Sequence, residues 1–205
     1  LMVSCVEKEK LPLILDEGKF ANEIHRTNIG KIAFMKDWIT IDEFQQRDFV
    51  NEISLSNSSD FGIRIFLNKT LTYYLNQLAP NLPVRELCDK GNFQVSFWVD
   101  NKEIFTSELP TGAGSCEYKN SATAYGVPLI NKKNPDHWGR FLWMKFMKKE
   151  GGQQALAEGH HKLTLKIRPY IQFEKLMIGE IIAQGEVNLS MVEKEVSESK
   201  IAIQK

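Results

Sequence analysis

Two segments in the last third of the chain alternate apolar and polar residues with a period of two. The apolar positions are Leu163, Leu165 and Ile167 in residues 161–168, and Ile181, Ala183, Val187, Leu189 and Met191 in residues 180–191. Successive side chains of a strand point to opposite faces, so each segment predicts a strand with one buried and one wet face. The pattern favours an antiparallel sheet that covers a core over a parallel sheet buried on both sides.

The polar faces of these two segments carry opposite charges. The first has Lys162, Lys166 and Arg168, and the second has Glu180 and Glu186. Opposite charges suit cross-strand neighbours, although such pairs contribute only about 0.2–1 kcal/mol each. The connection at residues 169–179 is too long for a tight hairpin, so we expect an intervening bend or two strands in different sheets.

Shorter alternations predict further strands at residues 30–34, 49–55, 61–67 and 92–99. The last of these is the clearest, because its odd-numbered positions are all apolar and its even-numbered positions are mostly polar. Asp100-Asn101 is typical of a tight turn, and it leads into another short strand candidate at residues 102–105. Residues 92–105 are therefore expected to form a hairpin.

One helix is predicted at residues 137–149, and Gly151-Gly152 ends it. Its expected buried stripe consists of Trp138, Phe141, Leu142 and Phe146. Residues 71–78 are ambiguous, because their leucines also fit helical spacing. Residues 110–135 are rich in Gly, Ser, Asn and Pro and are expected to form a long connection, which in a compact domain is usually functional or mobile.

Short strands separated by turn signals indicate a mainly β protein, an antiparallel β-sandwich of immunoglobulin-like or related type with one helix near 137–149. Periodicity alone does not separate a sandwich from a barrel. The run of Leu156, Gly159, His160, Leu163 and Leu165 resembles a late strand of immunoglobulin-like bacterial modules. We expect a tether or leader at 1–20, a single β-sandwich domain at 21–192, and a charged tail or linker at 193–205.

The chain carries 26 basic and 26 acidic residues among 205, a net charge of zero. Nucleic-acid binders normally have a basic excess or a basic stripe, so a nucleic-acid partner is not expected. The start, Leu1-Met2-Val3-Ser4-Cys5, resembles the end of a bacterial lipoprotein signal, which makes Cys5 a lipidation candidate. This resemblance implies an extracytoplasmic protein, periplasmic or on the cell surface, with membrane attachment through the lipid. The alternative is a leader from a longer chain.

The other cysteines, Cys88 and Cys116, have no metal-type spacing to each other or to Cys5. They could form a disulfide in an oxidising compartment or remain as two buried thiols. The sequence leaves both possibilities open.

No catalytic, cofactor or metal motif stands out. The four histidines lack the spacing that brings ligands together, so neither a metal nor another cofactor is predicted. Ser115 and Cys116 end a glycine-rich run that is neither a nucleophile elbow nor a phosphate loop. Asp136 is adjacent to His137 in sequence and is poorly placed to orient it as a catalytic base. Catalytic activity is therefore not expected.

Aromatic residues at expected solvent-facing or loop positions are the candidate binding residues: Trp98, Tyr118, Tyr125 and Trp143. Trp98 lies on the polar side of a strand whose other side is fully apolar. An exposed aromatic ring can stack on a sugar or anchor a protein partner. The competing interpretation places Trp98 in a second small core under a helix or loop.

The sequence favours a non-catalytic extracytoplasmic module that binds a partner protein or a glycan. The alternatives are an accessory domain of a longer enzyme, such as a hydrolase, and a small-molecule carrier. A protein-binding module should expose an apolar patch near Trp98 or residues 110–135. A carrier should enclose an apolar pocket, and an enzyme should bring Ser115 or Cys116 to His137.

Overall fold

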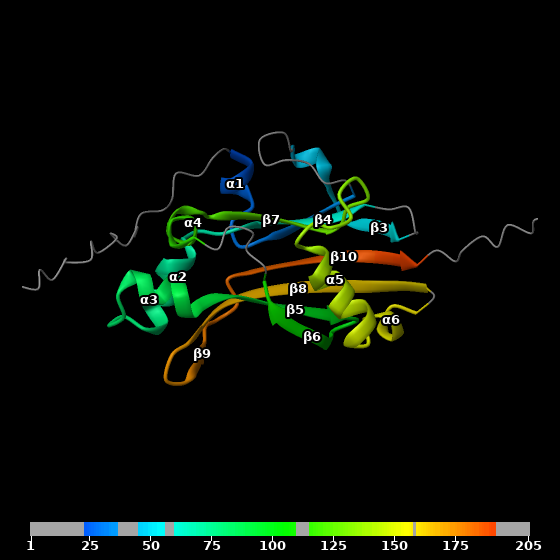
Figure 1. Ribbon diagram of the computed structural model, residues 1–205. Helices are drawn as coiled ribbons and strands as arrows, with labels where there is room; N and C mark the ends of the chain where they lie inside the picture. Colours follow the sequence, from blue (N-terminus) through cyan, green and yellow to red (C-terminus); the bar gives the residue numbers. More distant parts are fainter. Residues whose placement is uncertain (1–22, 37–44, 56–59, 110–114, 158, 192–205) are drawn as a thin grey trace, which may run out of the picture.

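The computed structural model describes residues 23–36, 45–55, 60–109, 115–157 and 159–191 (Figure 1). Two sheets dominate this part of the chain. The small sheet has the order β2 (Phe49–Val50), β1 (Ile32–Met35), β4 (Phe61–Phe66) and β7 (Ala124–Ile130). The large sheet has the order β3 (Glu52–Leu55), β10 (Ala183–Met191), β8 (Gly159–Gln172), β5 (Gly91–Val99) and β6 (Lys102–Glu108), with β9 (Leu176–Ile178) paired to the far end of β8.

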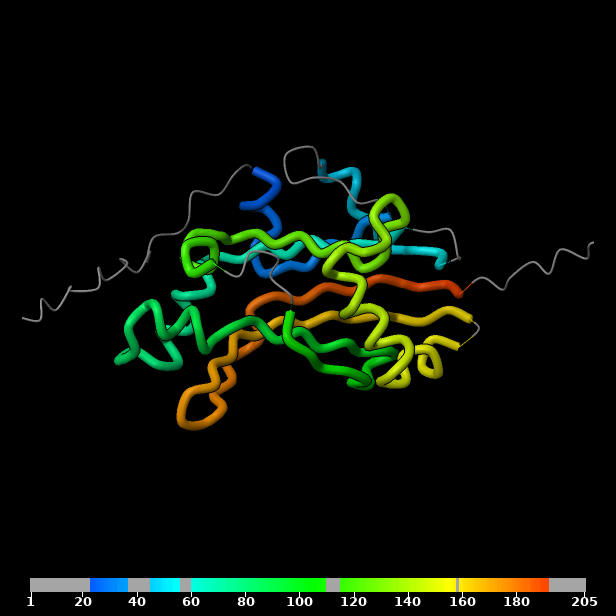
Figure 2. Tube along the Cα trace, viewed as in Figure 1, coloured from blue at the N-terminus to red at the C-terminus, as the bar shows by residue number. Residues whose placement is uncertain are grey.

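The two sheets lie in separate layers, the small sheet above the large one in Figures 1 and 2. Neighbouring strands run antiparallel except for β3 and β10, which are parallel. Side chains from both sheets, such as Ile63 and Leu165, join one hydrophobic core. The expected mainly β architecture with antiparallel sheets is therefore confirmed.

Short helices connect and flank the strands. They are α1 (Glu23–Thr27), α2 (Leu71–Leu78), α3 (Val84–Lys90), α4 (Cys116–Ser121), α5 (Arg140–Met144) and α6 (Gly152–Ala155), with a 3-10 turn η1 at Gln46–Asp48 and a π-helical turn η2 at Lys145–Lys149. In Figure 1, α2, α3 and α4 gather at one end, and α5 and α6 lie near the other. The ambiguous segment 71–78 is thus helical, and the Thr70 hydroxyl caps it by accepting a hydrogen bond from the Tyr73 amide at 3.3 Å.

Strands β8 and β10 confirm the strongest sequence pattern, and they pair directly with each other. Their inward side chains, from Leu163 to Ile167 and from Ala183 to Leu189, are buried, while Lys162 and Glu186 form an ion pair across the wet face at 3.5 Å. Strand β9 occupies part of the long connection by folding back on β8. The inward position expected for Ile181 is wrong: its side chain is 50% exposed, because it precedes the start of β10.

The segment 49–55 forms two strands in two sheets, where the sequence predicts one. Strand β2 pairs with β1, and β3 pairs with β10 on the other side of Asn51. The Asn51 carbonyl accepts a hydrogen bond from the Asn188 amide at 2.9 Å. Val50 and Asn51 interrupt the alternation of this segment, and the backbone changes partner at this interruption.

A second connection joins the sheets through Gly30, Lys31 and Gln184, which we call the seam. The Gln184 amide donates to the Gly30 carbonyl at 3.1 Å, and Lys31 forms a parallel bridge with Gln184. Next to it, a Cβ on Gly185 would overlap the carbonyl oxygen of Ile32. Glycine at this position therefore permits β1 and β10 to approach each other.

The connection expected at 110–135 contains two regular elements, α4 and β7, so this prediction is wrong over residues 116–130. Strand β7 contains Gly126 and Pro128, and these residue types led to the prediction of a loop. Because β7 lies at an edge of its sheet and pairs only with β4, it tolerates Pro128, which has no amide hydrogen to donate.

The helix predicted at 137–149 is shorter and differently oriented. It begins at Arg140 and widens into the π-helical turn from Lys145 onward. Phe141 is 68% exposed, whereas Leu142, Trp143 and Phe146 are buried. Phe146 stacks on Phe97 of β5 at a centroid distance of 4.7 Å, which places this helix over the inner face of the large sheet.

Candidate functional site

The outer face of the large sheet carries Trp98, whose side chain is half-buried. The indole Nε1 donates to the Ser96 hydroxyl at 3.0 Å, which fixes the ring along the strand. On the neighbouring strand β8, the ammonium of Lys166 lies 3.8 Å from the ring centroid, a cation–π contact. The position of Trp98 follows from the alternation of β5, in which Phe97 and Val99 point inward.

A pocket of about 350 Å³ opens beside this ring. Residues from three strands and one turn line it: Trp98, Asn101, Thr164, Lys166, Gln184, Gly185 and Glu186. The side chains combine one aromatic surface with amide, hydroxyl, carboxylate and ammonium groups. Such a site can contact an apolar ring face and also hydrogen-bond the polar edge of the same ligand.

The rim of the pocket is held by the β5–β6 turn. Asp100 and Asn101 have φ angles of 49° and 68°, the positive values that a two-residue hairpin turn of type I′ requires. Asp100 then attaches this turn to the start of β8. Its carboxylate accepts from the Lys162 amide at 2.9 Å and lies 2.8 Å from Nδ1 of His161.

His161 has an acceptor at each ring nitrogen, because its Nε2 lies 2.9 Å from the carbonyl oxygen of Ala157. Only the imidazolium form donates from both nitrogens, so this arrangement favours the charged ring. The hydrogen bond with Asp100 accordingly raises the pKa of His161 above 6.5. The same hydrogen bond is the main cause that lowers the pKa of Asp100 below 3.8.

We expect the exchange Asp100→Asn to lower the pKa of His161, because the neutral amide no longer favours the imidazolium. The stabilisation from the raised His161 pKa is complete below its ordinary value of about 6.5 and is lost as the pH rises through the folded value. That from Asp100 is present above about 3.8 and is lost as the pH falls through the lowered value. The pair therefore contributes most between these two limits.

The measurement is an NMR titration of the His161 ring signals. Asp89→Asn removes an exposed carboxylate that pairs with Arg85 on α3, so it serves as the control. An unchanged His161 pKa in Asp100→Asn would show that the two side chains are not coupled in solution.

The other three predicted binding residues do not join Trp98. Tyr118 is half-buried on α4 and packs edge-on against Tyr125 at 5.6 Å. The exposed positions expected for Tyr125 and Trp143 are wrong, because these side chains are only 3% and 8% exposed. Tyr125 belongs to the unforeseen strand β7, and the altered helix turns Trp143 toward Phe61 in the core.

The residues considered for nucleophilic chemistry have other roles. Cys116 is bonded to Cys88, and the Ser115 hydroxyl caps α4 by accepting from the Tyr118 amide at 3.2 Å. The Nδ1 atom of His137 accepts from the Arg140 amide at 3.0 Å, and burial lowers its pKa. The whole of β7, roughly 20 Å of extended chain, lies between Ser115 and His137.

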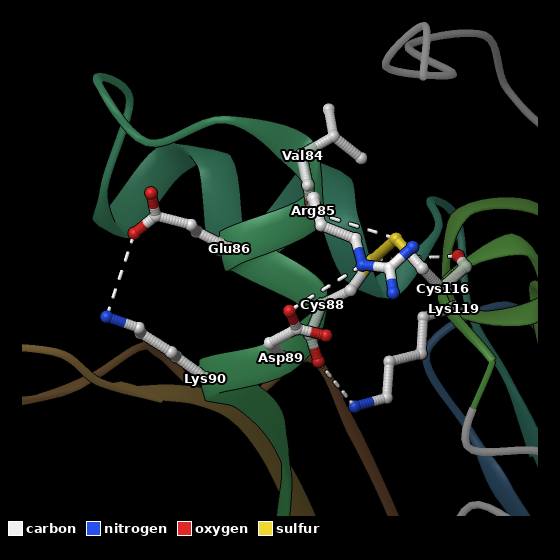
Figure 3. A network of polar contacts seen from close by, with 8 residues as sticks. All are labelled: Val84, Arg85, Glu86, Cys88, Asp89, Lys90, Cys116 and Lys119. Carbon is white, nitrogen blue, oxygen red and sulfur yellow. Dashed lines mark hydrogen bonds and ion pairs between the residues drawn. A yellow bond between two sulfur atoms is a disulfide. The ribbon is translucent and has the colours of Figure 1, made fainter. Parts of the chain in front are cut away.

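The disulfide of Cys88 and Cys116 joins α3 to α4, which settles the alternatives that the sequence left open (Figure 3). Beside it, the buried Lys119 donates to the carbonyl oxygens of Cys88 and Gly91 at 2.8 and 3.1 Å. Burial lowers the pKa of this ammonium. The buried ammonium group is therefore hydrogen-bonded to backbone carbonyl groups, and these bonds link α4 to the start of β5.

Exposed apolar side chains gather elsewhere, around the β9 arm. They are Phe173, Leu176, Ile178 and Ile181. A second open pocket of about 460 Å³ lies against this arm, with Tyr74 and Leu78 of α2 on its other side. The patch that the sequence places near Trp98 or residues 110–135 thus lies around β9, although Phe141 is also exposed.

Within the described ranges, no group of three or more His, Cys, Asp or Glu side chains could hold a metal ion. The helices of that part of the chain include none that is long and apolar enough to cross a membrane. Cys5 lies outside the described residues, as do residues 1–20 and 193–205. Comparison with known protein families, curated proteins and solved structures finds no significant match to this chain.

Sequence reasoning missed Lys166, Gln184 and Glu186 as neighbours of Trp98. All three occupy wet positions of the predicted strands, so the alternation already placed them on an outer face. What the sequence lacked was the order of the strands, in which β8 lies between β5 and β10.

Proposed function

We propose that the chain is a non-catalytic extracytoplasmic module that binds a glycan in the Trp98 pocket. We further propose that its two sheets form a β-sandwich of immunoglobulin-like or related type. The observation that carries the functional proposal is the half-buried indole among polar side chains from β8, β10 and the β5–β6 turn. A sugar ring offers an apolar face to such an aromatic surface and hydroxyl groups to the amides and carboxylate around it.

A glycan fits this pocket better than a protein partner. The centre of a protein interface is usually apolar and lacks charged residues, with an aromatic anchor at its core. Around Trp98 the lining is polar instead, with Asn101, Thr164 and Gln184 as hydrogen-bonding groups. The exposed apolar side chains that would suit a protein lie on the β9 arm.

Two observations bear on location and on the alternative functions. The disulfide supports an oxidising compartment, where such bonds persist. We propose attachment to a membrane through a lipid on Cys5. The strand β7 between Ser115 and His137 supports a binding module over a hydrolase of this type. The two pockets described above are open and not enclosed, which favours binding at the surface over a carrier that would use either of them. An accessory domain of a longer enzyme would use the same pocket.

Replacing Trp98 with alanine is expected to weaken glycan binding about tenfold, because the stacking surface of about 1–2 kcal/mol is lost. Glycans that bind the wild-type protein on an array of neutral and acidic oligosaccharides would be measured by titration calorimetry with both proteins. Phe141→Ala, which removes an exposed aromatic ring far from the pocket lining, is the matched control and should bind normally.

Two results would contradict the proposal. One is a wild-type protein that binds no glycan on the array. The other is a Trp98→Ala protein that is folded by circular dichroism and binds as tightly as the wild type.

A further inference from the structure

The ammonium of Lys166 occupies the position where a stacked ligand would meet Trp98. Ser96 lies opposite Lys166 in the pairing of β5 with β8, and the indole leans over Ser96, whose side chain is only 4% exposed. The lysine reaches across the strands and holds its Nζ 3.8 Å from the ring centroid. A ligand that stacks on this face must therefore displace the ammonium or bind it.

Of the two charged side chains that line the pocket, Glu186 has a partner of opposite charge and Lys166 has none among the described residues. Glu186 is the one carboxylate among the lining residues, and its Oε1 pairs with Lys162 at 3.5 Å. Lys162 does not line the pocket. Lys166, in contrast, has no carboxylate within ion-pair distance in the described part of the chain. Among the described residues, the pocket thus presents an ammonium group that contacts an aromatic face and pairs with no carboxylate.

We infer that the ligand of the Trp98 pocket is an acidic sugar, whose carboxylate or sulfate binds the ammonium of Lys166. This inference rests on the proposed glycan function and names the class of glycan. A neutral sugar would move the ammonium off the indole and offer it only neutral hydroxyl acceptors in place of the cation–π contact. An acidic sugar gives the ammonium a charge-assisted hydrogen bond, while its ring contacts the indole.

The lysine side chain suits this role. Its four-carbon stem can stay along the sheet while the ammonium follows the anion, since lysine carries a point charge on a flexible chain. The carboxylate of Glu186 repels a bound anion less than a free carboxylate would, because Lys162 forms an ion pair with it. Gln184 and Asn101 remain to bind hydroxyl groups.

The test compares sugars that differ in charge alone. Oligomers of glucuronic, galacturonic and mannuronic acid would each be titrated beside their neutral methyl esters, with a sulfated disaccharide as a further arm. Binding is measured by calorimetry with the wild type, Lys166→Gln and Arg168→Gln. Arg168→Gln is the control, because it removes a positive charge from the same strand. Arg168 hydrogen-bonds to Gln94 and does not line the pocket.

We expect the wild type to bind at least one acid ten times or more tighter than its ester. Lys166→Gln should bring this ratio close to one, because the acid loses its ionic partner and the ester no longer has an ammonium to displace. Arg168→Gln should keep the preference. Tight binding of the sulfated disaccharide alone would identify sulfate as the anion and would support the inference equally.

The outcomes also separate this inference from the function on which it rests. If acids and esters bind equally and Trp98→Ala weakens both, the glycan function stands and the acidic ligand is refuted. A preference that survives Lys166→Gln refutes the role of Lys166. If no sugar of either kind binds, both proposals fall together.

Discussion

Replacing Phe97 with alanine should lower the free energy of unfolding by about 3–5 kcal/mol. Phe97 is fully buried on the inner face of β5. It stacks on Phe146 at 4.7 Å and packs against Phe105 at 5.5 Å, measured between ring centroids. The Phe97 ring fills the contact between the large sheet and the helix above it. Alanine would leave a cavity there, and the neighbouring rings could fill this cavity only in part.

Urea denaturation followed by circular dichroism measures this loss. Phe141→Ala is the matched control, because the same substitution at a side chain that is 68% exposed should change the free energy of unfolding by less than about 0.5 kcal/mol. A loss of under 1 kcal/mol at Phe97 would mean that the helix does not cover the large sheet as described.

Replacing Cys88 and Cys116 together with alanine should cost about 3–4 kcal/mol, the loop-closure estimate for two cysteines 28 residues apart. The bond limits the freedom of the unfolded chain between α3 and α4, and this limit disappears in the double variant. Replacing both residues avoids new thiols that could form other bonds. The Trp98 pocket lies on the large sheet away from these helices, so the folded variant should bind its ligand normally.

Thermal and urea unfolding with and without dithiothreitol measure the contribution. Reductant should destabilise the wild type by a similar amount and leave the double variant unchanged. If the reductant destabilises both proteins equally, its effect does not come from this disulfide, and an unaltered double variant would show that the bond adds no stability.

The strands β3, β8 and β10 of the large sheet could be predicted because their side chains alternate between buried and more exposed positions. The alternation of Leu163, Leu165 and Ile167 marks β8, and the positive φ angles at Asp100 and Asn101 match the turn expected there. Strand β4 illustrates the limit of this signal. All six of its residues are buried, so the opposite sides that the pattern assigns to Ile63 and Arg64 do not correspond to core and solvent.

Predictions failed where the backbone, and not the side chains, decides the structure. The switch between sheets occurs where Val50 and Asn51 interrupt the alternation, but an interrupted pattern does not say with which strand each half pairs. The edge strand β7 contains Gly126 and Pro128, which are typical of loops. Trp143 shares one helical stripe with Leu142 and Phe146, whereas the predicted stripe used Phe141, which is 68% exposed.

The candidate site was predictable in part. Trp98 stands out because it is the one large aromatic on the polar side of its strand. Its neighbours depend on which strands are adjacent, and residues 66 positions or more away from Trp98 in sequence meet it only after the sheet forms. An alternation pattern describes each strand separately and contains no information about this order.

The seam has a consequence for how the chain acquires its structure during synthesis. Gly30 and Lys31 bond to Gln184, and β3 pairs with β10, the final strand of the described chain. The earliest strands are therefore left without these partners until more than a hundred further residues have left the ribosome. Contacts so distant in sequence slow folding, and the unpaired edge of β3 is a place where a nascent chain can pair wrongly. A protein with this connection would benefit from a chaperone that covers this edge until β10 is synthesised.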